Sequence, residues 1–597
     1  MSKSILSNIS TYSITSWSSR LTGVFSKKSK RQNSNQHIII HFFIIGAFLF
    51  VPINACFSQY TSESQIKQAH EILQARGEVI LKFAKPEAIT IERLNRFISI
   101  DRIKNDTIWA YLSAKQFNAF LETNIAFTVI ERQAKKASAL KSTGSVWNWD
   151  KYPNYQEYIS MMDSFSLKHA QLCQINNIGS SLKNRKILFC HISSDTSKTK
   201  PKVMYTASMH GDEIGGYILM LRLIDFLLNN YQKDAAVTRM VDSLDIWINP
   251  LANPDGTYFN DSTVWDATRF NANNIDLNRN FPDPIAGMHP DDNDYQPENT
   301  AMISFMKSNH FSLSANFHGG AEVVNYPWDS NLASHADKAW FEYISKEYAD
   351  SAQYFGRSKY FTDVSTYGFV DGAWWYKVYG GRQDYVTGEL CGREVTIELD
   401  QNKTTQETEL QNLWNYNYRS LLHYLEQGMY GIHGFVTDSA TGKPISASVR
   451  FLKHDNDSSL VYSSITKGDY YRFMNEGTYD IVFSASGYFD KTYKNIQIKN
   501  RETTYLNGTL KYGNKETNLD SLATGLSVFP NPCNKKLMIN TKTKGVIQFF
   551  SISGKLISTN IVDNNFSINT SALAAGMYML KFKNDSVSQT TKLLIVH

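Results

Sequence analysis

Two side chains able to bind one metal ion lie three residues apart at the end of an expected strand. His210 and Glu213 follow the apolar run 203–209, and the run 214–228 after them has the amphipathic spacing of a helix. At such a turn an imidazole nitrogen and a carboxylate oxygen can converge on one ion, and this donor pair is typical of zinc. His318, at the end of another apolar run, is the best candidate for a third ligand. Alone, the His-x-x-Glu spacing is weak evidence, because many surface pairs share it.

Further motifs accompany this pair in a fixed order between residues 210 and 399. They read His210-Gly-Asp-Glu213, Asn253-Pro-Asp-Gly256, Asp276-Leu-Asn-Arg-Asn-Phe-Pro282, Ala315-Asn-Phe-His-Gly-Gly320, Asn325-Tyr-Pro-Trp-Asp329, Tyr379-Gly-Gly-Arg-Gln-Asp-Tyr385 and Thr396-Ile-Glu-Leu399. The set resembles the zinc metallocarboxypeptidases, in particular the subfamily of carboxypeptidases D, E, M and N. The resemblance covers residues 147–428 and implies an enzyme, a peptide hydrolase that acts as an exopeptidase.

The resemblance implies the chemistry of this centre. One Zn²⁺ per chain would be held by His210, Glu213 and His318, with a fourth position for a water whose pKa the metal lowers. Glu398 matches the general base that takes a proton from this water and passes it to the leaving amine. Arg269 matches the cation that stabilises the oxyanion. An ordinary strand glutamate is the alternative for Glu398, although an unpaired carboxylate among apolar neighbours is costly.

Other matched residues concern the substrate and the orientation of a ligand. Asn278 and Arg279 match the pair that binds the terminal carboxylate, for which the planar guanidinium is suited. Tyr385 matches a mobile phenol that closes over bound substrate. Asp276 matches a carboxylate that orients the imidazole of His210.

Asp329 bears on substrate choice. In the resembled subfamily, the acid that ends Asn-Tyr-Pro-x-Asp faces the pocket for the last side chain, where a negative charge selects Lys or Arg. A solvent-exposed loop carboxylate is the alternative. The resemblance therefore implies removal of C-terminal residues, with a preference for Lys or Arg, from peptides or proteins.

Residues 145–428, the expected catalytic domain, alternate between short β-rich runs and helical stretches. This alternation predicts an α/β fold with a mixed central sheet and helices on both faces. The resemblance implies that this is the metallocarboxypeptidase fold. Ligands of such sheets bind at the strand ends and in the loops beyond them, where the candidate residues fall. The β-rich runs are 186–192, 203–209, 244–250, 313–317 and 395–399.

Two segments precede this domain. Residues 1–59 are expected to be a signal-peptide region, because a long basic stretch leads into the apolar run 38–51, which is shorter than the about 20 residues of a membrane span. Residues 60–144 predict a small α+β domain that resembles the pro-segments of digestive carboxypeptidases in position and size, although the D/E/M/N subfamily generally lacks one. An inhibitory pro-segment, released by cleavage in the linker 132–144, and a permanently attached accessory domain remain alternatives.

Two all-β sandwiches are expected after the catalytic domain. Residues 429–511 resemble the transthyretin-like domain of the same subfamily. Beyond a polar linker at 512–522, residues 523–597 resemble the C-terminal sorting domains of type IX secretion. This resemblance implies export through the periplasm of a Gram-negative bacterium to a secreted or cell-surface location, with the type IX machinery as a partner. A further adhesion module is the alternative.

The composition excludes other partners. The net charge of +5 comes from residues 1–36, which hold six Lys or Arg and no acid, so nothing predicts nucleic-acid binding. No stable membrane span is expected after signal removal. Apart from Cys56, the cysteines are too few and too scattered for a disulfide framework, although export permits a bridge. They are Cys173, Cys190, Cys391 and Cys533.

Two other functions remain open. One is a non-catalytic peptide-binding surface protein on the same scaffold. The other is an amidase that acts on peptidoglycan stem peptides.

Overall fold

The computed structural model describes residues 61–595 except 132–146, 261, 457–458, 514–525, 530, 532, 534, 542, 552–554, 564 and 585–587. The expected signal-peptide region therefore lies outside the described residues, as do the linker 132–144 and most of the linker 512–522. No helix among the described residues is both long and apolar enough to cross a membrane.

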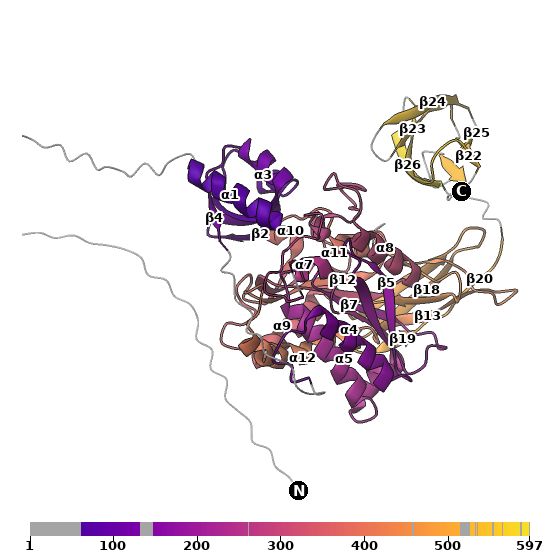
Figure 1. The fold of residues 1–597 in the computed structure, drawn as a ribbon. Coiled ribbons are helices and arrows are strands. Elements are labelled where there is room, and N and C mark those ends of the chain that lie inside the picture. Colours follow the sequence, from indigo (N-terminus) through magenta and orange to yellow (C-terminus); the bar gives the residue numbers. More distant parts are fainter. Residues whose placement is uncertain are drawn as a thin grey trace, which may run out of the picture. The chain divides into compact units, whose positions relative to one another are not determined.

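An eight-stranded mixed sheet forms the centre of the predicted catalytic domain (Figure 1). Its order is β11-β10-β12-β9-β7-β8-β6-β5, in which the inner strands β12, β9, β7 and β8 are parallel and the pairs β10–β12, β8–β6 and β6–β5 are antiparallel. The strands are β5 Cys173–Ser180, β6 Lys186–Ile192, β7 Lys202–Ala207, β8 Asp245–Asn249, β9 Leu313–His318, β10 Ala321–Tyr326, β11 Phe369–Asp371 and β12 Arg393–Asp400.

Alternate residues of the inner strands enter two different cores. In β7, Val203 and Tyr205 pack into the larger core, whereas Met204 between them packs into a smaller one. Successive side chains of a strand point to opposite faces, so a strand that is apolar throughout must be covered on both sides. The continuous apolar runs of the sequence are thus explained by burial of both faces.

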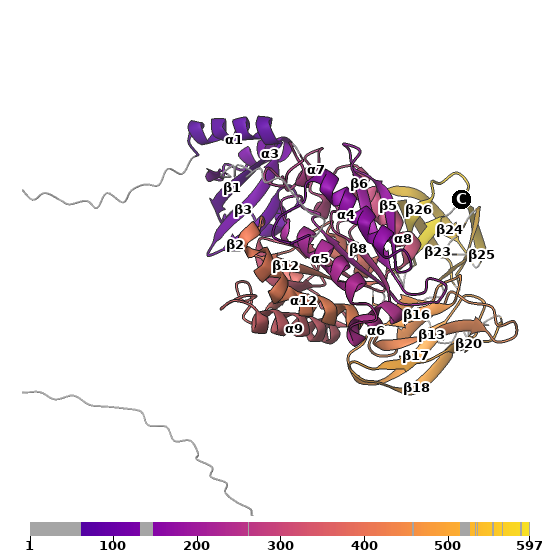
Figure 2. The same ribbon diagram turned by 60° about the horizontal axis from the view of Figure 1, so that its bottom comes forward.

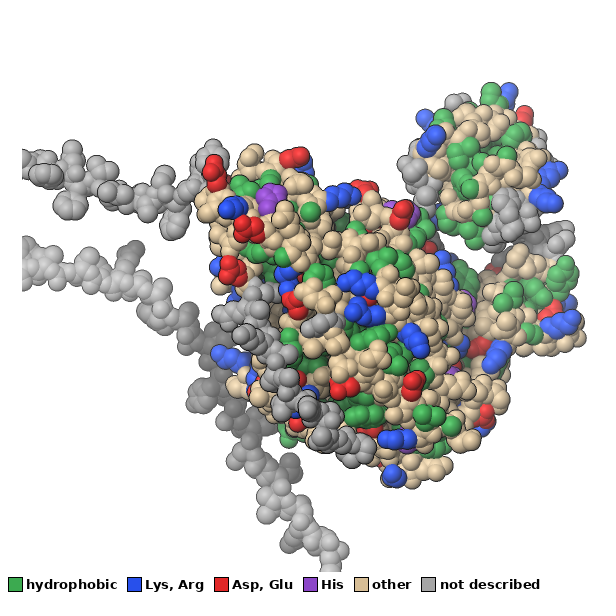
Figure 3. Space-filling view, in the orientation of Figure 1, with side chains coloured by type: hydrophobic (Ala, Val, Ile, Leu, Met, Phe, Trp, Pro, Cys, Tyr) green, Lys and Arg blue, Asp and Glu red, His purple; other side chains and the backbone are tan. Residues whose placement is uncertain are grey.

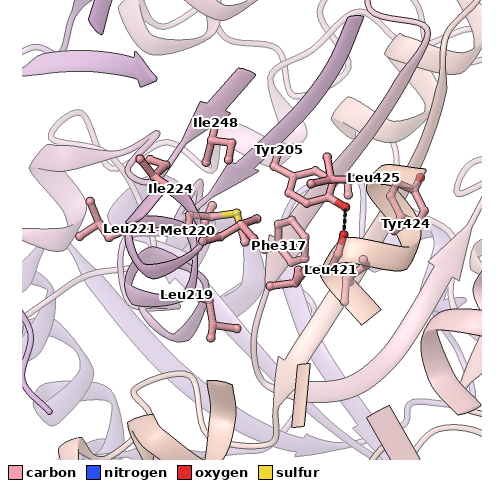
Figure 4. Packing of buried hydrophobic residues seen from close by; sticks show 14 of the residues in the cluster. Tyr205, Leu219, Met220, Leu221, Ile224, Ile248, Phe317, Leu421, Tyr424 and Leu425 are labelled. Atoms are coloured by element: carbon pink, nitrogen blue, oxygen red, sulfur yellow. Dashed lines mark hydrogen bonds between the residues drawn. The ribbon is translucent and has the colours of Figure 1, made fainter. Parts of the chain in front are cut away.

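Helices cover both faces, as predicted. One face carries α4 Tyr155–Lys168, α5 Gly215–Asn230, α6 Ala235–Ser243, α9 Lys338–Phe355 and α12 Leu410–Gln427, and the other carries α8 Pro297–Asn309 and α11 Arg382–Gly388. Helices α9, α12 and α5 lie side by side (Figures 1 and 2). Figure 4 shows the core beneath them, where the Tyr205 hydroxyl donates a hydrogen bond to the carbonyl of Leu421 at 2.8 Å. Short helical turns are α7 Pro254–Thr257, η1 Leu277–Arg279, α10 Gly372–Trp375 and η2 Glu407–Glu409.

Side-chain caps fix several of these helix starts. Asn154 accepts a hydrogen bond from the backbone of Glu157 at 2.9 Å, and the Glu157 carboxylate accepts one from the backbone of Asn154 at 2.8 Å. The carboxylate of Asp234 accepts from Ala236 and Val237 in the first turn of α6. Each cap satisfies backbone donors that have no partner within the helix.

The segment before the catalytic domain folds around a core of its own. Helices α1 and α3 cover a four-stranded antiparallel sheet of order β2-β3-β1-β4 (Figure 2). The expected α+β arrangement of this N-terminal domain is therefore present. Its elements are α1 Glu63–Arg76, β1 Glu78–Ala84, α2 Ile91–Leu94, β2 Ser99–Lys104, β3 Thr107–Ser113, α3 Ala114–Leu121 and β4 Phe127–Ile130.

Two β-sandwiches complete the chain, each with a core of its own. The first pairs a sheet of β13 Gly431–Asp438, β16 Asp469–Arg472, β19 Thr503–Tyr505 and β20 Gly508–Leu510 with a sheet of β14 Ser448–Phe451, β15 Val461–Tyr462, β17 Gly477–Ser484 and β18 Lys491–Ile498. The second pairs β21 Ser527–Phe529, β22 Lys536–Asn540 and β25 Asn565–Asn569 with β23 Gly545–Ser551, β24 Leu556–Val562, β26 Gly576–Lys583 and β27 Ser588–Ile595.

Charges of both signs are interspersed on the face of the molecule in Figure 3.

A buried charge cluster joins the first β-sandwich to the catalytic domain. The carboxylate of Asp337, before α9, accepts hydrogen bonds from Arg393 at 2.8 Å and from Arg472 of β16 at 2.8 Å. His454 of the sandwich lies 2.9 Å from the same carboxylate, and Arg472 also pairs with Asp455. Burial raises the pKa of Asp337, but the charges of Arg472 and Arg393 hold it well below its usual range. One carboxylate therefore neutralises buried cations from two domains.

Asp337→Ala should lower the free energy of unfolding by about 3–5 kcal/mol, because among the described residues it leaves Arg393 without a carboxylate and Arg472 with only Asp455. Urea unfolding measures this change. Asp350→Ala is the control, since its pair with Lys346 is more than half exposed and should cost less than about 1 kcal/mol. Equal losses for both variants would show that the cluster does not hold the two domains together.

Candidate metal centre and active site

The predicted metal ligands come from the ends of two neighbouring parallel strands. β7 and β9 run side by side from Val203 opposite Leu313 to Ala207 opposite Phe317. His318 is the last residue of β9, while His210 and Glu213 lie in the turn between β7 and α5. Because parallel strands end at the same edge of a sheet, the three side chains meet there.

The ligand atoms of these three residues converge at this edge. Nδ1 of His210 lies 3.1 Å from Nδ1 of His318, and the two carboxylate oxygens of Glu213 lie 3.0 and 2.8 Å from these nitrogens. All three side chains are buried. A cation between these atoms would offset the cost of burying the Glu213 carboxylate, and two His with one Glu are the donors of a catalytic zinc site. The residues present thus fit the ion that the sequence predicts.

The far nitrogens of both imidazoles are also held. Nε2 of His210 lies 3.1 Å from Oδ1 of Asp276, and Nε2 of His318 lies 2.8 Å from the side-chain amide of Asn316. These contacts fix the ring orientations and turn Nδ1 of each ring toward the centre. Asp276 therefore lies where the sequence predicts it, and Asn316 is a second orienting group that the sequence analysis did not single out.

Close backbone packing shapes the turn that carries His210. A Cβ atom added to Gly211 would lie 2.3 Å from the carbonyl carbon of Gly256, so this contact admits only glycine. Asn253 donates a hydrogen bond to the carbonyl of Met209 at 3.2 Å, and the Thr257 hydroxyl donates to the carbonyl of Gly211 at 2.8 Å. The Asn-Pro-Asp-Gly motif thus supports the turn and is not itself part of the site.

Arg269 lies beside the centre, bound on both sides by carboxylates. Its Nε donates to Asp276 at 3.1 Å and its Nη1 donates to Glu213 at 3.2 Å. The side chain is buried and faces the same cavity as the ligands. A guanidinium fixed in this way can stabilise negative charge that develops nearby.

Glu398 faces the ligands from the adjacent strand. In the pairing of β12 with β9, Glu398 stands opposite His318. Its Oε2 is buried and has no hydrogen-bond partner among the described residues. Burial first, and then repulsion by Glu213, raise the pKa of Glu398 well above its usual range. A carboxylate with a free oxygen and a raised pKa is suited to accept and return a proton.

The predicted carboxylate-binding pair borders the same cavity. Nη1 of Arg279 donates to the carbonyl of Asn278 at 3.0 Å, and Oδ1 of Asn278 accepts from the backbone of Arg382 at 3.0 Å. Nη2 of Arg279 donates at 3.4 Å to the carbonyl of Ile100, which belongs to the N-terminal domain. The guanidinium is thus aimed at an oxygen that another part of the chain supplies.

Asp329 is buried, with only 5% of its surface exposed, so the exposed-loop alternative does not hold. Its Oδ1 accepts hydrogen bonds from Asn325 at 2.9 Å and from Gln383 at 3.0 Å, and the residue borders the ligand cavity. Burial first, and then repulsion by Asp384, raise its pKa well above the usual range. A cationic ligand beside Asp329 would offset the free-energy cost of burying this carboxylate in its ionised form.

The structure contradicts the prediction for Tyr385. This side chain is 1% exposed and packs against Phe281 in the smaller core, and it does not border the ligand cavity. Tyr376 borders the cavity instead. The Gln-Asp-Tyr motif lies in α11 but did not show which face of that helix the phenol occupies.

The N-terminal domain also enters this site. The Asp101 carboxylate lies 2.6 Å from Nζ of Lys403 and 3.7 Å from Nη1 of Arg269, and it borders the ligand cavity. Around it, the Glu78 carboxylate accepts from the backbone of Arg269 at 2.9 Å, and the Tyr111 hydroxyl donates to the Asp212 carboxylate at 2.9 Å. The remaining cavity has a volume of about 40 Å³. Sequence analysis missed Asp101 and Lys403, because no local motif links residues so far apart.

Comparisons with known proteins match three parts of the chain to families. Residues 158–420 match the family described as zinc carboxypeptidase, residues 431–511 match the carboxypeptidase regulatory-like domain, and residues 527–596 match the secretion system C-terminal sorting domain.

Two curated relatives show how far the likeness extends. The chain is 36% identical to carboxypeptidase D of Homo sapiens over 60% of its length, but it spans only 26% of that relative. It is 30% identical to carboxypeptidase M of Mus musculus over 57% of its length, which covers 79% of that relative. Among solved structures, carboxypeptidase A of Helicoverpa armigera aligns over 59% of this chain and 98% of its own with 16% identity and a TM-score of 0.48.

Replacing either histidine of the centre should remove the metal. In His210→Ala and His318→Ala, we expect the zinc content of the purified protein to fall from one ion per chain to nearly none, because two donors rarely hold zinc in competition with a chelator. Elemental analysis by mass spectrometry measures this. The exposed His289 is the control, and His289→Ala should keep its zinc. Full zinc in either ligand variant would contradict the assignment.

Proposed function

Because the chain belongs to the zinc carboxypeptidase family, we propose that it hydrolyses the last peptide bond of peptides or proteins. The observation that supports this most strongly is the convergence of His210, Glu213 and His318 in the cavity that Glu398 also borders. These three residues would hold one zinc ion. When bound, the ion supplies a water of lowered pKa and polarises the substrate carbonyl.

The surrounding residues would act on the proton and the developing charge. Glu398 takes a proton from the attacking water through its free Oε2 and delivers it to the leaving amine. Arg269 stabilises the oxyanion, since it is held in place by Asp276 and needs no reorganisation. Together these roles support a hydrolase over a non-catalytic peptide-binding protein.

Recognition of the free C-terminus would fall to Asn278 and Arg279. Arg279 has an Nη2 donor that now binds a main-chain carbonyl and a buried Nε without a described partner. Both donors can serve a substrate carboxylate in a forked arrangement. Every substrate presents this carboxylate, so the pair would support exopeptidase action without selecting a side chain.

Asp329 would select the last side chain. Its carboxylate is buried, borders the cavity and has no cation in hydrogen-bond contact among the described residues. A terminal Lys or Arg would supply that cation, and an apolar side chain would leave the carboxylate uncompensated. We therefore infer a preference for C-terminal Lys or Arg.

The specificity prediction is that Asp329→Asn reduces kcat/KM for a C-terminal Arg peptide by roughly 30-fold or more, because a desolvated charge pair loses one partner. The same change should affect a C-terminal Leu peptide much less. Arg279→Ala is the matched comparison and should weaken both peptides alike. A parent enzyme that prefers Leu, or an Asp329→Asn variant that weakens both peptides equally, would contradict the preference.

The N-terminal domain would keep the enzyme latent. Asp101 and the carbonyl of Ile100 engage Lys403, Arg269 and Arg279, the cations that line the path of a substrate. The remaining space of about 40 Å³ is far below the roughly 300 Å³ at which ligand pockets begin. These contacts support the pro-segment interpretation over that of a permanent accessory domain.

Release of this domain should activate the enzyme. With a protease site inserted into residues 135–144, cleavage of the full-length protein should raise turnover of a small Arg-terminated peptide at least ~10-fold, since the blocking contacts can then dissociate. Asp101→Asn without cleavage should raise turnover in part, because the Ile100 carbonyl still binds Arg279. Asp106→Asn, on an exposed turn of the same domain, is the control and should change nothing. Equal turnover before and after cleavage would favour the accessory-domain interpretation.

The sorting-domain match at residues 527–596 supports export by the type IX secretion machinery to the cell surface or beyond. We propose that the last sandwich serves as this address and has no part in the chemistry.

A further inference from the structure

A second, larger cavity opens beside the metal centre. It has a volume of about 800 Å³ and lies between the N-terminal domain and two stretches of the catalytic domain, residues 265–267 and 401–406. It meets the small cavity of the metal centre at Asp101 and Gly320, which border both. The candidate metal ligands border the small cavity, which adjoins the large one at Asp101 and Gly320.

The two ends differ in the residues that border them. Asn278, Arg279 and Asp329 border the small cavity and not the large one. If these residues bind the terminal carboxylate and the last side chain, as proposed above, the rest of the substrate must leave on the other side of the metal centre. The residue just before the scissile bond therefore passes Gly320 and the start of the large cavity.

Lys403 stands at this position. Its side chain is 13% exposed and borders the large cavity, and its Nζ pairs with Glu213, a candidate metal ligand. The same Nζ lies 3.4 Å from the carbonyl of Gly319 and 5.3 Å from the centre of the Tyr111 ring. Because the Lys403 ammonium contacts a candidate metal ligand, the side chain of the substrate residue next to the scissile bond can reach it.

The second carboxylate on Lys403 comes from outside the catalytic domain. Asp101 lies 2.6 Å from Nζ and belongs to β2 of the N-terminal domain. When that domain leaves, Glu213 is the carboxylate that remains in contact with Lys403 among the described residues, and it would be bound to the metal. The release would thus expose a mostly buried cation that had been neutralised by an aspartate.

We propose that Lys403 recognises an acidic side chain, Asp or Glu, on the substrate residue immediately before the scissile bond, and that Asp101 occupies this place in the latent form. This inference rests on the proposed carboxypeptidase function. It makes Lys403 a specificity-determining residue, at the opposite side of the metal centre from Asp329. It also explains why the blocking residue is an aspartate, since the N-terminal domain presents the group that this position binds.

The test uses the full-length protein cleaved within residues 135–144 and two peptides, acetyl-Ala-Asp-Arg and acetyl-Ala-Asn-Arg. These differ only in the charge of the penultimate side chain. A partly buried, charge-assisted contact should make kcat/KM roughly tenfold higher for the Asp peptide, and added salt should reduce the difference. Lys403→Gln should bring the ratio of the two peptides close to one. Lys403→Arg, which keeps the charge, should preserve it.

Lys346→Gln is the matched control, because it removes an exposed charge far from both cavity linings and should leave the ratio unchanged. If Lys403→Gln abolishes turnover, the dissociation constants of the two peptides are compared instead. The parent protein should then bind the Asp peptide more tightly, and the variant should bind both peptides alike. Equal kcat/KM for both peptides in the parent protein, or a preference that survives Lys403→Gln, would overturn this inference but not the proposed function. Failure of the cleaved, zinc-loaded protein to cut any peptide would overturn the proposed function and this inference with it.

Discussion

The convergence of two imidazole nitrogens and a carboxylate within about 3 Å of one another is the constraint on which the site depends. Such a cluster of electron pairs is unfavourable in a buried place unless a cation lies among them. The surrounding residues reduce the free-energy cost of burying this cluster. Asp276 and Asn316 hold the outer nitrogens, while Arg269 and Lys403 bring positive charge to Glu213. The parallel strands β7 and β9 make the convergence possible because they end at the same edge.

Much of this site could be predicted from the sequence because its motifs are local. His210, Glu213 and His318 follow or end apolar strands and Glu398 lies within another, and strand order then brings them together. Tyr385 could not be placed in this way. Residues two apart on a helix do not share a face, and in α11 it is Gln383 that reaches Asp329, so Tyr385 turns into the core.

No sequence motif could predict the contacts between domains. Asp101 and Lys403 are separated by three hundred residues, and neither is unusual in its own sequence context. The edge strands β5 and β11, and β10 next to β11, were missed for a related reason, since they lack the long apolar runs of the inner strands. Conversely, the small N-terminal domain was predictable as a fold, because its strands and helices alternate over short distances. Its role depends on which surface it covers, and only the three-dimensional contacts bear on that.

Turnover by Glu398→Gln tests the proposed catalytic centre most directly. The full-length protein and this variant, each cleaved within residues 135–144, are compared for zinc content, peptide binding and hydrolysis of an Arg-terminated peptide. We expect one zinc ion per chain and similar peptide affinity in both, with turnover reduced at least ~100-fold in the variant, because the general base is lost. Unchanged turnover in Glu398→Gln would contradict the account, since proton transfer would then have to come from another group.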